Sequence, residues 1–232
     1  MEIRMFRWLV DAIFPKQCLR CGREGMWACE ECQTAILPYI LRGCVICKKE
    51  SEGMFCGDCA RNTPVSFLFS AYSYMDPFAR KMVHALKYEY VADVGAVMGV
   101  LLARAYVSCR RETATHARVV PIPIHKKRFR DRGFNQSELI ARAYARELQM
   151  PIVAGALERV VNTQSQVELS GFDRMKNIAG AFAVHDKENI QGSIIYLIDD
   201  VYTTGATLIE AARTLKNAGA QDVIGLTFAR EE

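Results

Sequence analysis

Residues 196–208, YLIDDVYTTGATL, form the stretch that decides which fold we expect for this sequence. An apolar run ends in two carboxylates, and a short turn rich in hydroxyl groups then leads into a predicted helix. The run SIIYLID at 193–199 is apolar almost throughout, which is typical of a parallel strand buried on both faces. Ligands of open α/β sheets bind outside the carboxyl ends of such strands. The stretch therefore predicts a ligand site at the edge of a parallel sheet.

The turn after this strand has the chemistry that a phosphate group needs. Gly205 permits a tight bend, and the nearby threonines supply hydroxyl donors. The first turn of the predicted helix adds unpaired backbone N–H groups and a favourable dipole. The two aspartates accept hydrogen bonds from sugar hydroxyls and attract a divalent cation. The residues that we expect to bind a sugar phosphate are Asp199, Asp200, Val201, Tyr202, Thr203, Thr204, Gly205, Ala206 and Thr207.

The rest of the sequence from residue 65 onward alternates between predicted strands and predicted helices. This order indicates an α/β fold with a parallel sheet covered by helices. Asn135 is a predicted N-cap, with Glu138 three positions later. A polar stretch at 161–182 is long for a loop, and such loops are often functional. The expected strands are 67–74, 118–124, 193–199 and 222–229, and the expected helices are 78–89, 93–107, 136–149 and 207–218.

The composition is that of an ordinary globular protein, with 232 residues of which 50% are hydrophobic and 24% charged. The formal net charge of +4 is too small to indicate a nucleic-acid-binding protein by itself. Residues 1–14 carry apolar side chains at helical spacing, which favours a short helix packed on its own domain over a membrane-surface or partner helix. Arg4, Arg7 and Asp11 interrupt these apolar residues, so we expect neither an export signal nor a membrane span.

Eight of the nine cysteines form four Cys-x-x-Cys pairs. Two thiolates three positions apart can bind one ion from a single turn, and two such turns complete the tetrahedral ligand set of Zn²⁺. We therefore expect two structural zinc ions. Sequential pairing of the turns is the simplest arrangement, and an interleaved pairing stays open. An iron–sulfur cluster and redox dithiols are the weaker alternatives. The expected ligands are Cys18, Cys21, Cys29, Cys32, Cys44, Cys47, Cys56 and Cys59.

The cysteine-rich region at 18–59 has few long apolar runs, so it needs a metal to fold stably. The composition changes around residues 62–64, and we place a domain boundary there. The chain then has an N-terminal helix and double zinc ribbon at 1–63 and an α/β domain at 64–232. Many cysteines without an export signal indicate reduced thiols, so we expect a cytoplasmic protein.

A basic segment follows the expected strand 118–124, with Phe129 and Phe134 among its cations. Three interpretations stay open: a solvated loop without a role, a clamp for pyrophosphate or substrate, and a track for single-stranded nucleic acid. The strand should end at the same sheet edge as the phosphate turn, which favours the clamp. Cations that follow a nucleic-acid backbone and rings that stack bases favour the track. The cations are Lys126, Lys127, Arg128, Arg130 and Arg132, and Arg174 lies in the polar stretch.

The phosphate turn closely resembles the signature loop of the type I phosphoribosyltransferases, which bind phosphoribosyl pyrophosphate (PRPP). This resemblance implies that Asp199 and Asp200 face the ribose hydroxyls at the catalytic centre and that residues 203–207 wrap the 5′-phosphate. It also implies that Mg²⁺ bridges the ribose and the pyrophosphate. The polar stretch at 161–182 resembles the mobile loop that closes over PRPP in that fold family.

Further motifs extend the resemblance to nearly the whole chain. They are VVPIPIHKKRFRDRGFNQSELIARAYA at 119–145, HALKY at 84–88, the four cysteine pairs, and the series Thr163, Gln166, Leu169, Arg174 and Asn177. Together they are similar to the ComF family of competence proteins, whose members join a zinc-ribbon region to a type I phosphoribosyltransferase-like domain. The family is associated with natural transformation, the uptake of single-stranded DNA.

The resemblance implies a cytoplasmic DNA-uptake factor that binds single-stranded DNA and Mg-PRPP beside a DNA-uptake helicase and other competence proteins. Two alternatives stay open. One is an active phosphoribosyltransferase that acts on a base, a nucleotide or a DNA end. The other is a PRPP-sensing module without turnover. The phosphate turn cannot separate them, because binding and catalysis need the same phosphate contacts.

Overall fold

The computed structural model of the chain describes residues 15–40, 43–51, 54–109, 116–161 and 178–231. The expected helix within 1–14 lies outside these residues. The same holds for the motif residues of the polar stretch, which are Thr163, Gln166, Leu169, Arg174 and Asn177.

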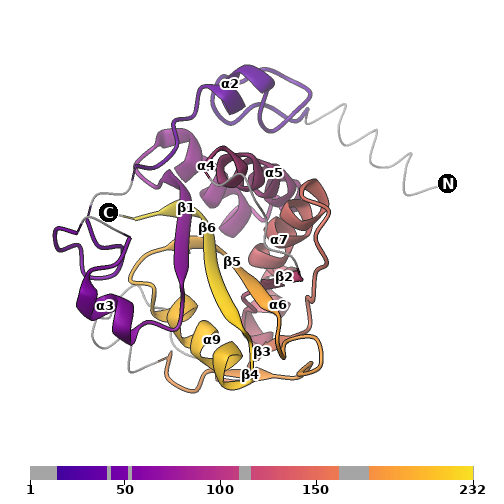
Figure 1. Cartoon of the computed structure of the whole chain (residues 1–232). Coiled ribbons are helices and arrows are strands. Elements are labelled where there is room, and N and C mark those ends of the chain that lie inside the picture. The colour runs from indigo at the N-terminus through magenta and orange to yellow at the C-terminus, as the bar shows by residue number, and fades with distance from the viewer. Residues whose placement is uncertain (1–14, 41–42, 52–53, 110–115, 162–177, 232) are drawn as a thin grey trace.

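A four-stranded parallel sheet forms the centre of the protein (Figure 1). Its strand order is β1-β6-β5-β2, and all three neighbouring pairs run parallel. The expected parallel sheet is therefore confirmed. The strands are β1 (Phe67–Ser73), β2 (Ala117–Pro121), β5 (Ile194–Tyr202) and β6 (Asp222–Arg230).

Helices cover both faces of this sheet, as the alternation of elements predicts. Strand β5 shows why both faces must be covered. Tyr196 and Ile198 pack into the hydrophobic cluster of one face, and Ile195 and Leu197 pack into that of the other. The first face carries α4 (Pro77–Lys87), α5 (Ala92–Cys109) and α7 (Gln136–Glu147). The second carries α9 (Ala206–Asn217) and a small antiparallel hairpin, β3 (Leu157–Arg159) with β4 (Phe182–Val184).

Local capping explains where two of these helices begin. The carboxylate of Asp76 accepts hydrogen bonds from the backbone N–H groups of Phe78 (2.8 Å) and Ala79 (2.9 Å), and α4 starts directly after it. Asn135 caps α7 as predicted, by accepting from the N–H of Ser137. Such caps satisfy donors that the first helical turn leaves unpaired.

Helix α5 is long and apolar enough to cross a membrane by length and composition alone. Half of its apolar window is nevertheless buried within the protein, against α4, α7 and the sheet. Its glycines explain this close packing. A Cβ atom on Gly99 would lie 2.3 Å from the carbonyl oxygen of Ile140, so α7 can approach only a glycine at this position. This environment is that of a core helix.

The structure differs from the expected elements of the α/β domain by more than two residues at four places. The strand expected at 118–124 ends at Pro121, where its pairing with β5 ends. Strand β5 does not end at Asp199 but continues to Tyr202, because Val201 and Tyr202 pair with the end of β6. The basic segment, expected as a loop, forms the helix α6 (Lys126–Arg132). The hairpin β3–β4 was not expected, because its strands have only three residues each and flank the polar stretch.

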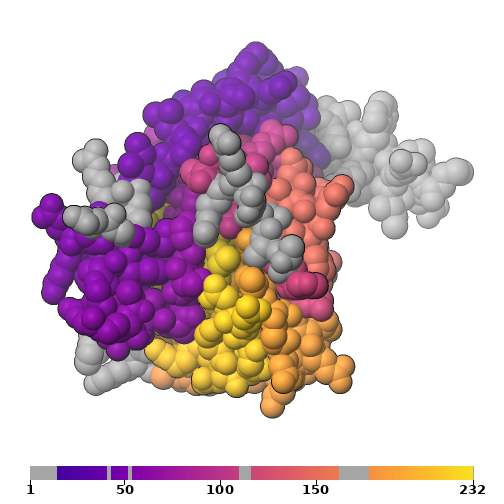
Figure 2. Space-filling view, viewed as in Figure 1, coloured from indigo at the N-terminus to yellow at the C-terminus, as the bar shows by residue number. Residues whose placement is uncertain are grey.

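Two small modules precede the sheet and attach to it at different places. The first, which includes α2 (Glu30–Thr34), packs on the helical face, where the Nζ of Lys16 lies 2.7 Å from a carboxylate oxygen of Asp93 in α5. The second, which includes α3 (Gly57–Asn62), packs beside edge strand β1. There, the sulfur of Met54 accepts from the N–H of Leu68 (3.0 Å). In Figure 2 the first module lies at the top and the second at the left of the yellow C-terminal segment.

Candidate functional site

The two aspartates of β5 lie side by side at the carboxyl end of the sheet. Asp200 is only 3% exposed, and its Oδ1 lies 3.0 Å from the Nζ of Lys87 at the end of α4. Its Oδ2 has no hydrogen-bond partner among the described residues. The Oδ1 of Asp199 accepts from the hydroxyl of Ser137 (2.8 Å) and from the N–H of Asp200 (2.9 Å). A buried carboxylate oxygen without a partner is costly, so this oxygen is suited to a cation or a ligand hydroxyl.

Burial and neighbouring charges shift the pKa values of Asp199 and Lys87. Burial and, to a smaller extent, the adjacent Asp200 carboxylate raise the pKa of Asp199, to a net value of about 7. Ser137 and Lys87 oppose that shift. Burial lowers the pKa of Lys87, but the attraction of Asp200 and Asp199 outweighs it, and the net pKa is raised. Two carboxylates thus face one ammonium group, and a hard divalent cation such as Mg²⁺ would fit their oxygen donors.

The phosphate turn lies between the end of β5 and the start of α9. Gly205 is the N-cap of α9 and has a left-handed φ of +77°. A Cβ atom at this position would lie 2.3 Å from the hydroxyl oxygen of Tyr202, so both the backbone angle and the space require glycine. Gly205 offers no side chain to the start of α9, and the N–H of Ala206 makes only a long hydrogen bond to the Oγ1 of Thr204 (3.4 Å). The other N–H groups in the first turn of this 12-residue helix are suited to an anion.

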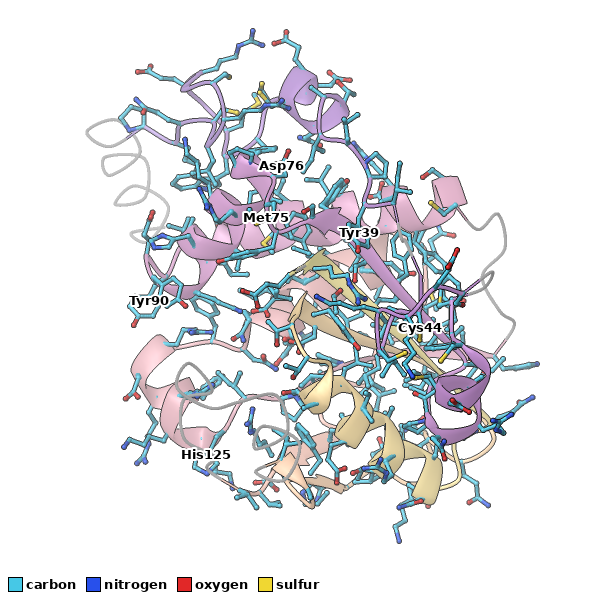
Figure 3. All side chains as sticks on the ribbon, turned by 90° about the vertical axis from the view of Figure 1, so that its left-hand side faces the viewer. Tyr39, Cys44, Met75, Asp76, Tyr90 and His125 are labelled. Carbon is cyan, nitrogen blue, oxygen red and sulfur yellow. The ribbon has the colours of Figure 1, made fainter. Side chains whose placement is uncertain are left out.

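A cavity of about 690 Å³ joins these features. The acidic pair and the whole phosphate turn line one side of it. The loop after α4, helix α6 and strand β3 also line this cavity, with aromatic and cationic side chains. In Figure 3, Tyr90 in the loop after α4 and His125 at the N-cap of α6 lie at the left, and Cys44 lies at the right. The aromatic and cationic lining residues include Tyr88, Tyr90, Arg128, Arg132 and Arg159.

Helix α6 divides the basic segment between two surfaces. Arg128 and Arg132 are one turn apart and line the cavity of the phosphate turn. Lys126 and Arg130 instead line a second hollow with Ile124 and Phe129, whose ring is 47% exposed. The segment is thus neither a loop nor a single patch. Lys127 lines neither hollow, and Arg174 lies outside the described residues.

Three residues of this site were missed from the sequence. Lys87 is the fourth residue of the motif HALKY, which carries the family resemblance but does not by itself indicate a partner for an aspartate. Ser137 looks like an ordinary first-turn serine, yet it donates to Asp199. Arg159 is 7% exposed, and its pKa is lowered by burial and by nearby Arg128, against the attraction of Asp199. No sequence pattern indicates these residues, because they lie on three separate elements, α4, α7 and β3, that meet at the acidic pair only in the folded protein.

The eight paired cysteines form two compact groups, and the sequential pairing is the one that the structure adopts. Within each group, the four sulfur atoms lie within 4.8 Å of one another. The Sγ atoms of Cys21 and Cys29 are 3.7 Å apart, and those of Cys47 and Cys56 are 3.6 Å apart. Sulfurs bound to one tetrahedral zinc ion are separated by about 3.8 Å. The first group is Cys18, Cys21, Cys29 and Cys32, and the second is Cys44, Cys47, Cys56 and Cys59.

The electrostatics of both groups also suit a bound cation. Burial raises the pKa of Cys18, but backbone N–H groups that point at its sulfur outweigh burial and lower the pKa to about 6. Burial and hydrogen bonds to the other thiols raise the pKa of Cys32 to about 12. Cys44 and Cys59 show the same contrast. Four thiolates cannot coexist at such distances without a positive ion, so each group fits structural Zn²⁺.

Comparison with known proteins gives the family. A model of the phosphoribosyl transferase domain matches residues 135–231. The DNA utilization protein YhgH of Salmonella typhimurium is 33% identical over 226 residues, which are 96% of this chain and 91% of the relative. This chain belongs to the ComF family of competence proteins. Competence protein F of Haemophilus influenzae, another ComF relative, is 27% identical over 90% of the chain and 95% of its own length.

Two further comparisons cover parts of this ComF chain. Competence protein ComFC of Bacillus subtilis is 36% identical over half of the chain and 45% of its own length. A solved glutamine PRPP amidotransferase from B. subtilis matches with a TM-score of 0.40 and 18% identity. The match covers 60% of this chain but only 26% of that enzyme. The ComF chain thus joins a phosphoribosyltransferase-like domain to two four-cysteine groups.

The cysteine groups predict the metal content of the purified full chain. Elemental analysis should give two zinc ions per chain, because each group supplies four sulfur ligands. Cys18→Ser should reduce this to about one and lower thermal stability, since loss of a metal removes folding free energy. Cys109→Ser is the matched control, because Cys109 is exposed and belongs to neither group. Iron in place of zinc would contradict the assignment.

The raised pKa of Asp199 predicts how stability varies with pH. Its pKa is about 7 in the folded protein, against about 3.9 in an unfolded chain. Between these values the folded protein holds a proton that the unfolded chain releases, so the free energy of unfolding should fall as the pH rises from about 4 to about 7. Asp199→Asn should remove a slope of up to about 1.4 kcal/mol per pH unit. Urea unfolding at several pH values without added metal measures this slope. Equal slopes in the unmodified protein and in Asp199→Asn would contradict the prediction.

Proposed function

We propose that this ComF-family protein is a cytoplasmic DNA-uptake factor that binds Mg-PRPP at the phosphate turn and single-stranded DNA at α6. The names of its relatives, competence protein and DNA utilization protein, support the role in DNA handling. The match to the phosphoribosyl transferase domain supports PRPP as the ligand class. A DNA-uptake helicase and other competence proteins are the proposed partners.

The observation that carries the ligand proposal is the unsatisfied oxygen of Asp200. This oxygen is buried, it lines the same cavity as the phosphate turn, and no described residue pairs with it. A ribose with its associated Mg²⁺ offers the hydroxyls and positive charge that such an oxygen needs. The first turn of α9 lines the same cavity, and its N–H groups suit the 5′-phosphate.

The proposed roles of the basic residues follow from their division on α6. Arg128 and Arg132 line the PRPP cavity, where they would neutralise the pyrophosphate. Phe129 and Arg130 lie in the second hollow, where an exposed ring beside a cation suits a base and its phosphate. DNA would then pass beside the PRPP cavity.

Turnover is the second candidate function, and the size and lining of the cavity favour it. Beyond the acidic pair, the cavity extends to Tyr88 and Tyr90, which are 61% and 53% exposed. Rings at this position could stack an acceptor base in the open half of the site. Release of pyrophosphate from Mg-PRPP on addition of single-stranded DNA, a nucleotide or a free base would identify an active phosphoribosyltransferase. Binding without release would leave a PRPP-regulated or PRPP-sensing protein.

Mg-PRPP should stabilise the full chain against heat. At about 100 times its Kd it should raise the melting temperature by about 5–10 °C. Thr204→Ala should shrink this shift, because it removes a hydroxyl from the phosphate turn, and Asp200→Ala should abolish it. Thr214→Ala is the matched control on α9, where its hydroxyl donates to the carbonyl of Glu210, away from the cavity. An unchanged melting temperature of the unmodified protein would overturn the PRPP proposal.

Single-stranded DNA should bind in a salt-dependent manner, as measured by the fluorescence anisotropy of a labelled oligothymidylate. Changing Arg128, Arg130 and Arg132 together to Ala should weaken binding by about tenfold and reduce the salt slope, because each lost phosphate contact contributes about 0.7 to it. The charge-matched control is the triple change of Arg61, Lys187 and Lys216, exposed residues that line neither hollow. Equal weakening by both triple variants would move the DNA site away from α6.

A further inference from the structure

Arg230, at the end of β6, is a buried cation with an unusual set of contacts. Its side chain is 3% exposed, and no carboxylate of the described residues forms a salt bridge with it. Its Nη2 donates to the carbonyl oxygen of Val45 (2.6 Å). Its guanidinium lies 4.6 Å from the ring centre of Tyr202 and 5.9 Å from that of Tyr39. A buried charge needs such contacts to offset its lost hydration, so these groups fix one another in place.

The ring of Tyr202 connects this cation to the phosphate turn. Tyr202 is 3% exposed and ends β5, immediately before the turn. Its hydroxyl end lies so close beneath Gly205 that no Cβ atom would fit between them. The carbonyl of Tyr202 also accepts from the N–H of Glu231, next to Arg230 (2.9 Å). The Tyr202 ring therefore packs directly against Gly205, the N-cap of α9, and the guanidinium of Arg230 packs on the same ring.

Val45 connects the same cation to the second cysteine group. It lies within the turn Cys44–x–x–Cys47, and its side chain is 1% exposed. The N–H of Val45 also bonds to the carbonyl of Met54, inside the module. A bound metal fixes the backbone of such a turn, and with it the direction of the Val45 carbonyl. The side chain of Val45 belongs to the hydrophobic cluster that contains Tyr202, Ala206 and Leu208.

The first cysteine group has a different place in the molecule. Cys18, Cys29 and Cys32 belong to the hydrophobic cluster on the opposite face, with α4, α5 and α7. Two side-chain contacts join the four-cysteine part of this module to the α/β domain within the described residues, the pair of Lys16 with Asp93 and a hydrogen bond from Arg104 to Gln33. Both involve α5, which does not line the phosphate cavity. Tyr39, in the segment that leads to the second module, instead donates its N–H to the carbonyl of Ala71 in β1 (2.8 Å) and places its ring near Arg230. The two groups thus offer a comparison within one chain.

We propose that the second cysteine group positions the phosphate turn. The turn between Cys44 and Cys47 orients the carbonyl of Val45, which accepts a hydrogen bond from Arg230. The guanidinium of Arg230 in turn keeps the Tyr202 ring packed against Gly205. Arg230 and Tyr202 are thus positioning residues, and metal at the second group controls how tightly the cavity binds a phosphorylated ligand. The identity of that ligand rests on the proposed function, whereas the coupling itself is a property of the free protein.

Two double variants of the full chain test this coupling. Cys44→Ser with Cys47→Ser should weaken Mg-PRPP binding by about tenfold, measured by calorimetry, and Cys18→Ser with Cys21→Ser should change it by less than about twofold. Amide hydrogen exchange of the ligand-free proteins provides a second readout. The amides of residues 203–207 should exchange faster in the first variant only, while the centres of β5 and β6 stay protected in both. Equal effects of the two variants, or no effect of either, would overturn the proposal.

A third variant separates positioning from loss of the module. Arg230→Met should keep two zinc ions, yet weaken Mg-PRPP binding by about tenfold and speed exchange at 203–207, and Arg230→Lys should rescue only in part. Arg146→Met, an exposed arginine on α7, is the control. If the unmodified protein fails to bind Mg-PRPP, the proposed ligand is wrong, but faster exchange in Arg230→Met and the second-group variant would still establish the coupling. Normal exchange in both would refute it.

Discussion

A carboxylate removed from water must be paired, and Asp200 imposes this requirement on the whole carboxyl edge of the sheet. Lys87 satisfies one of its oxygens, which fixes the end of α4 beside β5. The other oxygen is left for something that the polypeptide does not supply. Burial of the neighbouring Asp199 raises its pKa to about 7, so the pair is poised to accept a metal or to hold a proton. The start of α9 and two cations of α6 line the same cavity as this acidic pair.

The fold was largely predictable because its signals are local. Apolar runs such as that of β5 indicate strands that are covered on both faces, and Asn135 marked the start of α7 correctly. The errors have physical causes. The end of β5 depends on its pairing with β6, and the residues of β5 alone do not indicate how far that pairing extends. Helix α6 consists almost entirely of charged residues, so it has no apolar periodicity, and it is instead bounded by His125 as N-cap and Gly133 as a left-handed C-cap.

The site was predictable only in the part that is continuous in sequence. The phosphate turn and both cysteine groups are short motifs, and the structure assembles each as expected. Lys87, Ser137 and Arg159 come from three other elements and carry no signal of their own. The basic segment shows the opposite case, since its cations are neighbours in sequence but face two different hollows. Helical geometry separates residues 128 and 132 from residues 126 and 130, and composition alone cannot make that division.

Strand β6 lies between β1 and β5, although it is the last of the four in sequence. During synthesis, the ribosome must therefore release β1, α5, α7 and β5 before the strand that joins them exists. Contacts as distant in sequence as Phe67 with Ile224 make this closure slow compared with local folding. The cysteine groups close over short loops and can take up metal early. The partner of the Val45 carbonyl, Arg230, emerges 185 residues later, and a chain that ends before β6 would keep all eight paired cysteines while β1 would lack the strand with which it pairs.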